Sequence, residues 1–177
     1  MSDQDLRYPI GAFKAPTTIS EQDLANWIYT VKQFPAKLQS AVKKLTNAQL
    51  DTPYRDGGWT VRQVIHHMAD SHMNSYIRFK LALTEDNPTI KPYLEDRWAE
   101  LPDAKTGDIE MSLMMIESLH TRWVFMLRNI QPAEWSRTFF HPERKTSMRL
   151  DTTLALYAWH CDHHLTHITN LKERMKW

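Results

Sequence analysis

Apolar residues recur every three or four positions in four long stretches of the chain, and this spacing is that of one buried face of an α-helix. Charged and polar side chains fill the positions between them. The pattern predicts helices over four ranges: 20–45, 60–83, 108–127 and 151–175. Amphipathic helices of this length must share a core, so we expect an all-α fold built as a four-helix bundle.

Polar residues mark where these helices should begin. Ser20, Asp108 and Asp151 each precede an apolar stripe and can accept a hydrogen bond from the first turn. Thr60 opens the tetrapeptide TVRQ, which has the spacing of a capping box. Pro35 lies inside the first range, where we expect it to kink the helix before the apolar stripe continues.

The segments that connect the helices differ in length. Residues 84–107 carry three prolines and are long for a connection within a compact domain, so we expect irregular chain with a functional or interfacial role. Residues 137–150, RTFFHPERKTSMRL, are compatible with a short β-hairpin. Residues 1–18 lack helical periodicity and should form an extended arm that lies on the domain. The bundle therefore departs from a simple up-and-down order of helices.

Composition narrows the class of protein. The 177 residues are close to the usual size of one domain, so we expect a single domain over 1–177. A net charge of +1 provides no field to hold a polyanion, and we expect no nucleic-acid partner. No stretch has the pattern of a secretion leader or a membrane span, which predicts a cytoplasmic protein without a membrane partner. The lone cysteine, Cys161, fits a reducing compartment.

Histidines near the end of the chain are the first candidate for chemistry. The segment YAWHCDHHLTH places His160 and His164 four residues apart, so both imidazoles can point to one place on the inner side of a helix. His163 and His167 have the same spacing, but the periodicity points them elsewhere. Two such histidines can bind a metal, or they can be packed and satisfied by backbone carbonyls.

A third ligand would have to come from another helix, and VIHHMADSH offers three histidines. His72 falls in the apolar stripe of that helix, whereas His67 lines up with polar residues. A polar row inside a bundle is costly unless it lines a wet cavity or touches a metal. His67 is therefore either exposed or part of a cavity wall, and periodicity does not choose between it and His72.

Three neutral imidazoles would leave a divalent metal with an open position, which is typical of a catalytic site. Cys161 is turned about 100° from its neighbour on a helix and is a poor fourth ligand. Asp70 and Asp162 are candidate acceptors for the distal N–H of a ligating histidine, although both could equally be solvated charges.

These segments resemble a known family: the DinB-like superfamily, and within it the YfiT-type metal-dependent hydrolases and bacillithiol S-transferases. The likeness runs over nearly the whole chain, in the stretches PYRDGGWTVRQVIHHMADSHMNSYIRFKLALTED, LHTRW, FFHPE and YAWHCDHHLTHI. It implies a bundle that binds one zinc or nickel ion per subunit through one histidine of the second helix and two of the last. Matched residue by residue, it implies metal ligands at His67, His160 and His164.

The resemblance also implies an enzyme in which the metal activates a nucleophile. That nucleophile would be a low-molecular-weight thiol, as in a bacillithiol S-transferase, or water, as in a hydrolase, acting on a small electrophile. The alternative is a non-enzymatic metal-binding stress protein or ligand-binding dimer. Asp70 and Glu117 are candidate general bases, and the sequence favours neither. The family implies a homodimer, and the apolar side chains of 93–101 predict that this segment and the arm contribute to its interface.

Overall fold

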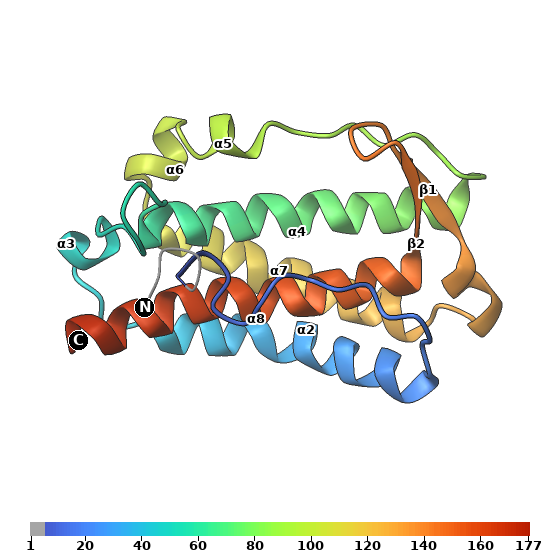
Figure 1. Cartoon of the computed structure of the whole chain (residues 1–177), viewed down its shortest axis with the longest axis horizontal. Coiled ribbons are helices and arrows are strands. Elements are labelled where there is room, and N and C mark those ends of the chain that lie inside the picture. The colour runs from blue at the N-terminus through green and yellow to red at the C-terminus, as the bar shows by residue number, and fades with distance from the viewer. Residues whose placement is uncertain (1–5) are drawn as a thin grey trace.

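The computed structural model describes residues 6–177, and four long helices dominate it (Figure 1). They are α2 (Glu21–Val42), α4 (Val61–Thr84), α7 (Ile109–Arg128) and α8 (Leu150–Met175). The shorter elements are α3 (Asn47–Leu50), α5 (Glu95–Trp98), α6 (Pro102–Thr106), the 3-10 helix η1 (Pro132–Ser136), and strands β1 (Thr138–His141) and β2 (Thr146–Arg149). The predicted all-α four-helix bundle is confirmed.

Local side-chain bonds explain three of the four helix starts. Ser20 and Thr60 each accept a hydrogen bond from the backbone N–H three residues later, and in both cases that residue bonds back to complete a capping box. Asp108 accepts from the Glu110 N–H. Helix α2 passes through Pro35 without ending, as the apolar stripe predicts.

The predicted cap at Asp151 is wrong. Helix α8 already begins at Leu150, with Arg149 in the cap position and no side-chain cap. The buried Asp151 carboxylate instead accepts hydrogen bonds from the Arg149 guanidinium and the Thr152 N–H. The helix starts early because strand β2 leads straight into it, and Leu150 is fully buried in the core.

Helix order around the bundle departs from an up-and-down arrangement. Helix α2 packs against α7 and α8, and α4 packs against the same two helices, so α2 and α4 occupy opposite corners. Helices α2 and α8 run in one direction and α4 and α7 in the other (Figure 1). Two neighbouring pairs are therefore parallel, and parallel neighbours need long connections.

The long connections lie along the outside of the bundle. The segment after α4 returns along that helix (Figure 1). It includes the short helices α5 and α6, so the prediction of irregular chain over 84–107 is only partly correct. The predicted hairpin is present, with Thr138 opposite Arg149 and His141 opposite Thr146. Residues 1–5 of the predicted arm fall outside the described chain, and the rest follows α8, where the Trp159 indole N–H donates to the Gly11 carbonyl.

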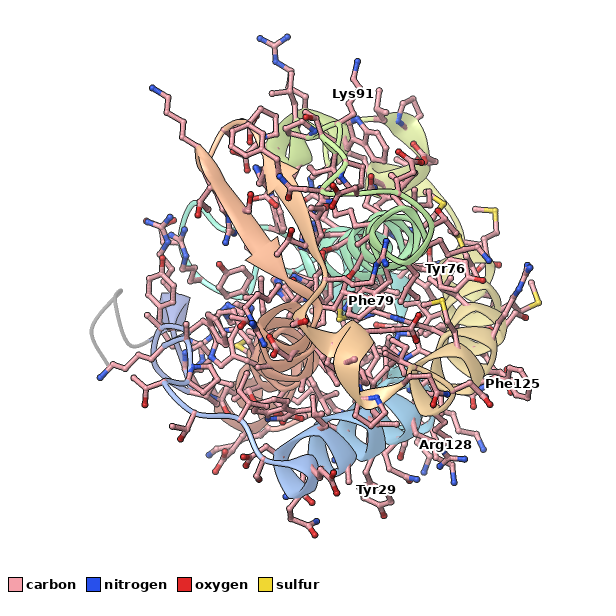
Figure 2. The ribbon with its side chains drawn as sticks, turned by 90° about the vertical axis from the view of Figure 1, so that its right-hand side faces the viewer. Tyr29, Tyr76, Phe79, Lys91, Phe125 and Arg128 are labelled. Atoms are coloured by element: carbon pink, nitrogen blue, oxygen red, sulfur yellow. The ribbon has the colours of Figure 1, made fainter. Side chains whose placement is uncertain are left out.

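One apolar core fills the space between the four helices. Phe34, Phe79 and Trp123 are among its largest fully buried side chains. Figure 2 shows Phe79 inside the bundle, whereas Tyr29 and Phe125 project from its surface with 60% and 73% of their area exposed. Among the described helices, none has the length and apolar character required to cross a membrane.

Candidate metal centre

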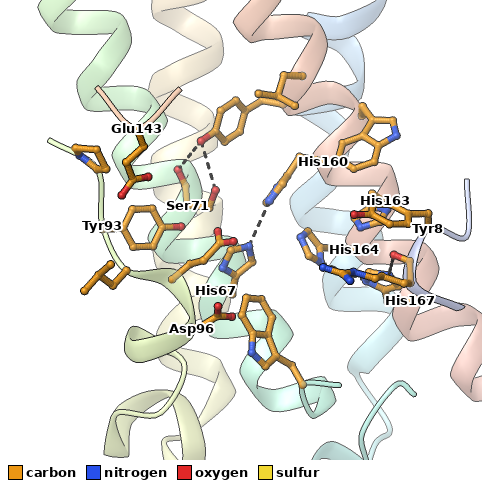
Figure 3. A pocket seen from close by; sticks show the side chains of 18 of the residues that line it. Tyr8, His67, Ser71, Tyr93, Asp96, Glu143, His160, His163, His164 and His167 are labelled. Atoms are coloured by element: carbon orange, nitrogen blue, oxygen red, sulfur yellow. Dashed lines mark hydrogen bonds between the residues drawn. The ribbon is translucent and has the colours of Figure 1, made fainter. Parts of the chain in front are cut away.

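Helices α4 and α8 bring three imidazoles together at the wall of one cavity (Figure 3). One nitrogen each from His67, His160 and His164 lies within 4.8 Å of the other two. His67 comes from α4, and the other two are one turn apart on α8. These residues could hold a metal ion. They are the same three residues that the resemblance to the DinB-like superfamily implies as ligands.

Spacing within this cluster fits a divalent ion. The Nε2 atoms of His67 and His160 are 3.3 Å apart. Nitrogen ligands at about 2.0–2.1 Å from a tetrahedral metal lie about 3.3–3.4 Å from one another. The distance between these two imidazoles therefore fits a tetrahedral ion, and the third, His164, has a nitrogen within 4.8 Å of both.

A chain of hydrogen bonds fixes which nitrogen of His160 is free. The Val31 carbonyl can only accept, so the His120 Nδ1–H, at 2.7 Å, donates to it. The His120 Nε2 then accepts from the His72 Nδ1–H at 2.7 Å. The His72 Nε2 in turn accepts from the His160 Nδ1–H at 3.1 Å. For neutral rings, this order leaves the His160 Nε2 with its lone pair facing the cluster.

His164 is oriented in the same way by a second chain. The His167 Nε2–H donates to the Arg7 carbonyl at 3.1 Å, which leaves the His167 Nδ1 as an acceptor. That atom lies 3.3 Å from the His164 Nδ1, so His164 carries its proton there and its Nε2 is free. The N-terminal arm and helix α2 thus each supply the carbonyl that orients one imidazole.

Burial keeps these rings neutral. It lowers the pKa of His67 to about 4, with a smaller contribution from the charge on His167. The pKa values of His160 and His164 are also far below the usual range, again mainly because of burial. A neutral imidazole is the form that binds a metal, so the folded protein presents three competent ligands at neutral pH.

A cavity of about 810 Å³ opens beside the cluster and contains all three histidines in its lining. Its other walls come from connections that the helical pattern does not describe: residues 92–97, the β1–β2 hairpin and the arm residues Arg7 and Tyr8. Tyr93, Asp96 and Glu143 face the histidines across this space (Figure 3). A metal held here would keep a side open to small molecules.

His163 and His167 do not point away from this site, contrary to the expectation from periodicity. Both are buried, both line the cavity, and with His164 they form a second group that could hold a metal. The two groups share His164 and so compete for it. The hydrogen bond from His164 to His167 engages the Nδ1 atoms of two members of the second group, which favours the group that contains His67.

Several other expectations for the site change. Cys161 is fully buried in the core and belongs to neither histidine group. The rotation of about 100° between neighbouring residues of a helix predicts this. Asp70 and Asp162 are not the acceptors, because the distal nitrogens of His160 and His164 bond to His72 and His167. Asp70 and Glu117 are both absent from the cavity lining, so neither candidate general base is placed to act there.

Sequence reasoning missed the roles of His72 and His120. Both lie in apolar stripes of their helices, where a histidine is easily taken for a core residue. The available signal was that each is polar inside a stripe, which demands a hydrogen-bond partner. Which residue becomes the hydrogen-bond partner of His72 or His120 depends on how α4, α7 and α8 pack together. The spacing of residues along one helix does not predict that packing.

The fold and the site together define a class: four-helix bundles in which a three-histidine cluster faces a large cavity. Residues 30–168 match the DinB superfamily, and the chain belongs to that family.

Close relatives carry names that refer to a metal. A protein of Bacillus mycoides (strain KBAB4) named "Putative metal-dependent hydrolase" is 56% identical, over 98% of this chain and 99% of its own. "Putative metal-dependent hydrolase YfiT" of Bacillus subtilis (strain 168) is 52% identical, over 100% of this chain and 99% of its own. A solved structure of YfiT from Bacillus subtilis superposes with a TM-score of 0.96 at 53% identity, covering 98% of this chain and 99% of that one. Its description is a probable metal-dependent hydrolase with an unusual four-helix bundle topology.

The chain of histidines predicts a distant effect on metal affinity. In His72→Leu, the His160 Nδ1–H loses its acceptor, and the ring is free to turn or change tautomer. We expect metal affinity, measured by competition with a chelator, to fall about 10- to 100-fold. In His72→Gln, the amide can accept from His160 and donate to His120, so most of the affinity should return. Equal affinities for wild-type protein and a folded His72→Leu variant would contradict this role.

Buried neutral histidines predict that the metal-free protein is sensitive to acid. Burial lowers the pKa of both His67 and His120 to about 4. Below the ordinary value of about 6.5, the unfolded chain takes up protons that the folded protein does not. The free energy of unfolding should therefore be fully retained above pH 6.5 and fall between pH 6.5 and 4, by up to about 1.4 kcal/mol per pH unit for each such histidine. Urea denaturation of metal-free protein at several pH values measures this slope, and a flat profile across the window would refute it.

Proposed function

We propose that this protein is an enzyme in which a divalent metal, zinc or nickel, is held by His67, His160 and His164 and activates a nucleophile. The nucleophile is a low-molecular-weight thiol, as in a bacillithiol S-transferase, or water, as in a hydrolase. The observation that carries the proposal is that two separate hydrogen-bond chains leave Nδ1 protonated in His160 and His164, so that both Nε2 lone pairs face His67. Without a metal, the His67 Nε2–H donates to the His160 Nε2 at 3.3 Å, and a bound metal would take the place of that proton.

The composition of the ligand set supports catalysis rather than a structural role. Three neutral imidazoles leave the full charge of a divalent ion uncompensated, and such an ion lowers the pKa of bound water to about 7 or ionises a bound thiol. Structural sites are normally closed by a fourth protein ligand. Cys161, the one thiol of the chain, is buried in the core and outside the cluster.

The cavity supports an organic substrate beside the nucleophile. A water molecule occupies about 30 Å³ in the liquid, and the cavity measures about 810 Å³. This volume accommodates a thiol together with its electrophile, or a single larger substrate for hydrolysis. The walls include the aromatic side chains of Tyr54, Trp59 and Tyr93, which can pack against apolar parts of a ligand and exclude water from it.

The residues around the cluster would orient the reaction. His72 and His167 hold the ligating rings. His120, itself bonded to the Val31 carbonyl, holds His72, and the Arg7 carbonyl holds His167. Glu95, Asp96 and Glu143 are the carboxylates that line the cavity, and any base that removes a proton from substrate would come from this set rather than from Asp70 or Glu117.

Loss of any one ligand should remove metal and activity together. We expect the His67→Ala, His160→Ala and His164→Ala variants each to lose tight metal binding, because two imidazoles hold a divalent ion poorly. Elemental analysis of the purified variants measures metal content. Turnover of metal-loaded protein with a panel of thiols and electrophiles, and with ester and amide substrates in water, separates transfer from hydrolysis.

Cys161→Ser is the matched control, since this residue follows His160 directly and yet faces the core. It should keep its metal and lose only modest stability, about 1–3 kcal/mol for a buried hydroxyl without a partner. A fully active His67→Ala protein would show that the ligand from α4 is misassigned. Bound metal without turnover in any assay would favour the alternative, a non-enzymatic metal-binding or ligand-binding dimer.

A homodimer is the second part of this proposal. The predicted interface segment 93–101 exposes Leu94 and Leu101, and the arm exposes Ile10. A second exposed apolar surface lies on helix α7, at Met111, Met114 and Phe125, with Tyr29 of α2 similarly exposed. Exposed apolar side chains on neighbouring helices are typical of a protein interface. We expect light scattering to give twice the 20.9 kDa of one chain. The mass of a single chain at micromolar concentration would rule out the dimer.

A further inference from the structure

The far end of the cavity contains polar groups that the metal cluster does not use. Among buried side-chain nitrogens without a hydrogen-bond partner in the described chain, three line this cavity: Arg78 Nε, His141 Nδ1 and His163 Nδ1. A buried donor without a partner costs free energy, so each such group needs an explanation. Two of them, Arg78 and His141, line the same cavity, and the positive charge of Arg78 helps to lower the pKa of His141.

Arg78 is the more costly of the two because its charge is permanent. Its Nε is buried, and among residues 6–177 no ion pair reaches its guanidinium. Within residues 6–177, none of the cavity carboxylates Glu95, Asp96 and Glu143 forms an ion pair with Arg78, although Glu143 acts on the same histidine ring. The side chain as a whole is half-buried, but its Nε–H is shielded from water and has no acceptor. This cost is offset when a ligand supplies an oxygen with negative charge.

His141 adds a second donor to the cavity wall, from a different element of the fold. It lies on β1, is 7% exposed, and its Nδ1 is without a partner. Burial lowers the pKa of His141, the positive charges of Arg78 and Arg144 lower it further, and Glu143 opposes them. The surroundings of this ring are therefore biased toward positive charge, even with the nearby carboxylate.

The position of Arg78 relative to the histidine cluster sets the length of the ligand. Arg78 follows His67 by eleven residues, which is close to three full turns of α4, and Ser71 between them also lines the cavity. One face of the helix thus joins the cluster to Arg78, over roughly 16 Å at 1.5 Å per residue. The tilt of helical side chains toward the N-terminus brings the guanidinium back toward the cluster.

We propose that Arg78, assisted by His141, forms a subsite for an oxyanion of the substrate, most naturally a carboxylate. An arginine fork matches a carboxylate with two parallel N–H···O bonds, and neutral His141 can donate from Nδ1. This inference rests on the proposed function for its substrate: an elongated molecule whose reactive end lies at the three histidines and whose anionic end lies at Arg78.

Binding of succinate to metal-free protein tests the subsite without any turnover. The Arg78 Nε–H signal in nitrogen-15 NMR, assigned by its loss in Arg78→Met, should shift on titration with succinate and stay in place with the uncharged succinamide. Arg78→Met should weaken succinate binding about tenfold or more, as expected for loss of a charge-assisted pair. His141→Phe should weaken it by a smaller factor. Inorganic phosphate, titrated in parallel, distinguishes a carboxylate site from a general oxyanion site.

Lys80→Gln is the control for long-range charge, because Lys80 is an exposed cation on the same helix and outside the cavity. It should leave succinate binding unchanged. Arg78→Lys keeps the charge but not the fork, so it should bind succinate with intermediate affinity, and it serves as the test if Arg78→Met does not fold.

Thermal stability gives an independent readout. Because Met retains the unbranched stem of arginine and removes a buried Nε–H that has no acceptor, ligand-free Arg78→Met should melt at or above the wild-type temperature. A lower melting temperature for Arg78→Met, or equal succinate binding by Arg78→Met and wild-type protein, would overturn the subsite. If succinate binds at Arg78 but the metal-loaded protein turns over no substrate, the subsite stands and the proposed enzyme does not.

Discussion

The rest of the site depends on the hydrogen-bond chain that runs from the Val31 carbonyl through His120 and His72 to His160. It passes through all four long helices in turn, α2, α7, α4 and α8. Each link has one possible direction for neutral rings, because the chain begins at an atom that can only accept. The packing of the bundle thereby determines that the Nε2 of His160, at the far end of the chain from Val31, carries the lone pair.

Such a site has a cost in stability. Histidines occupy positions in the bundle interior where leucine or isoleucine would pack better, and burial strongly disfavours their charged forms. Arg78 and His141 add unpaired polar groups to the wall of the same cavity. Proteins accumulate unfavourable groups of this kind at functional sites, where a ligand offsets them. The concentration of these groups in one cavity is the strongest physical argument that the cavity binds a substrate.

Features that repeat along one helix could be predicted from the sequence. Apolar spacing and the capping residues Ser20, Thr60 and Asp108 identify the helices, and the i, i+4 pair of His160 and His164 identifies their common face. Features that depend on contacts between elements could not. Periodicity left His67 and His72 as alternatives, whereas in the structure both contact His160, one beside its Nε2 and the other at its Nδ1. The carbonyl of Arg7 and the buried Nε of Arg78 carry no signal in a hydrophobic pattern at all.

Nitrogen-15 NMR of the imidazoles in metal-free protein at neutral pH can locate each proton of the hydrogen-bond chains. We expect neutral rings throughout the cluster, with the proton on Nδ1 in His120, His72, His160 and His164 and on Nε2 in His167 and His67. Adding zinc should then shift the Nε2 resonances of His160 and His164 and leave their Nδ1 protons in place. A proton on the Nε2 of His160 or His164 in the metal-free protein would contradict the account, because the nitrogen that should bind the metal would already be occupied.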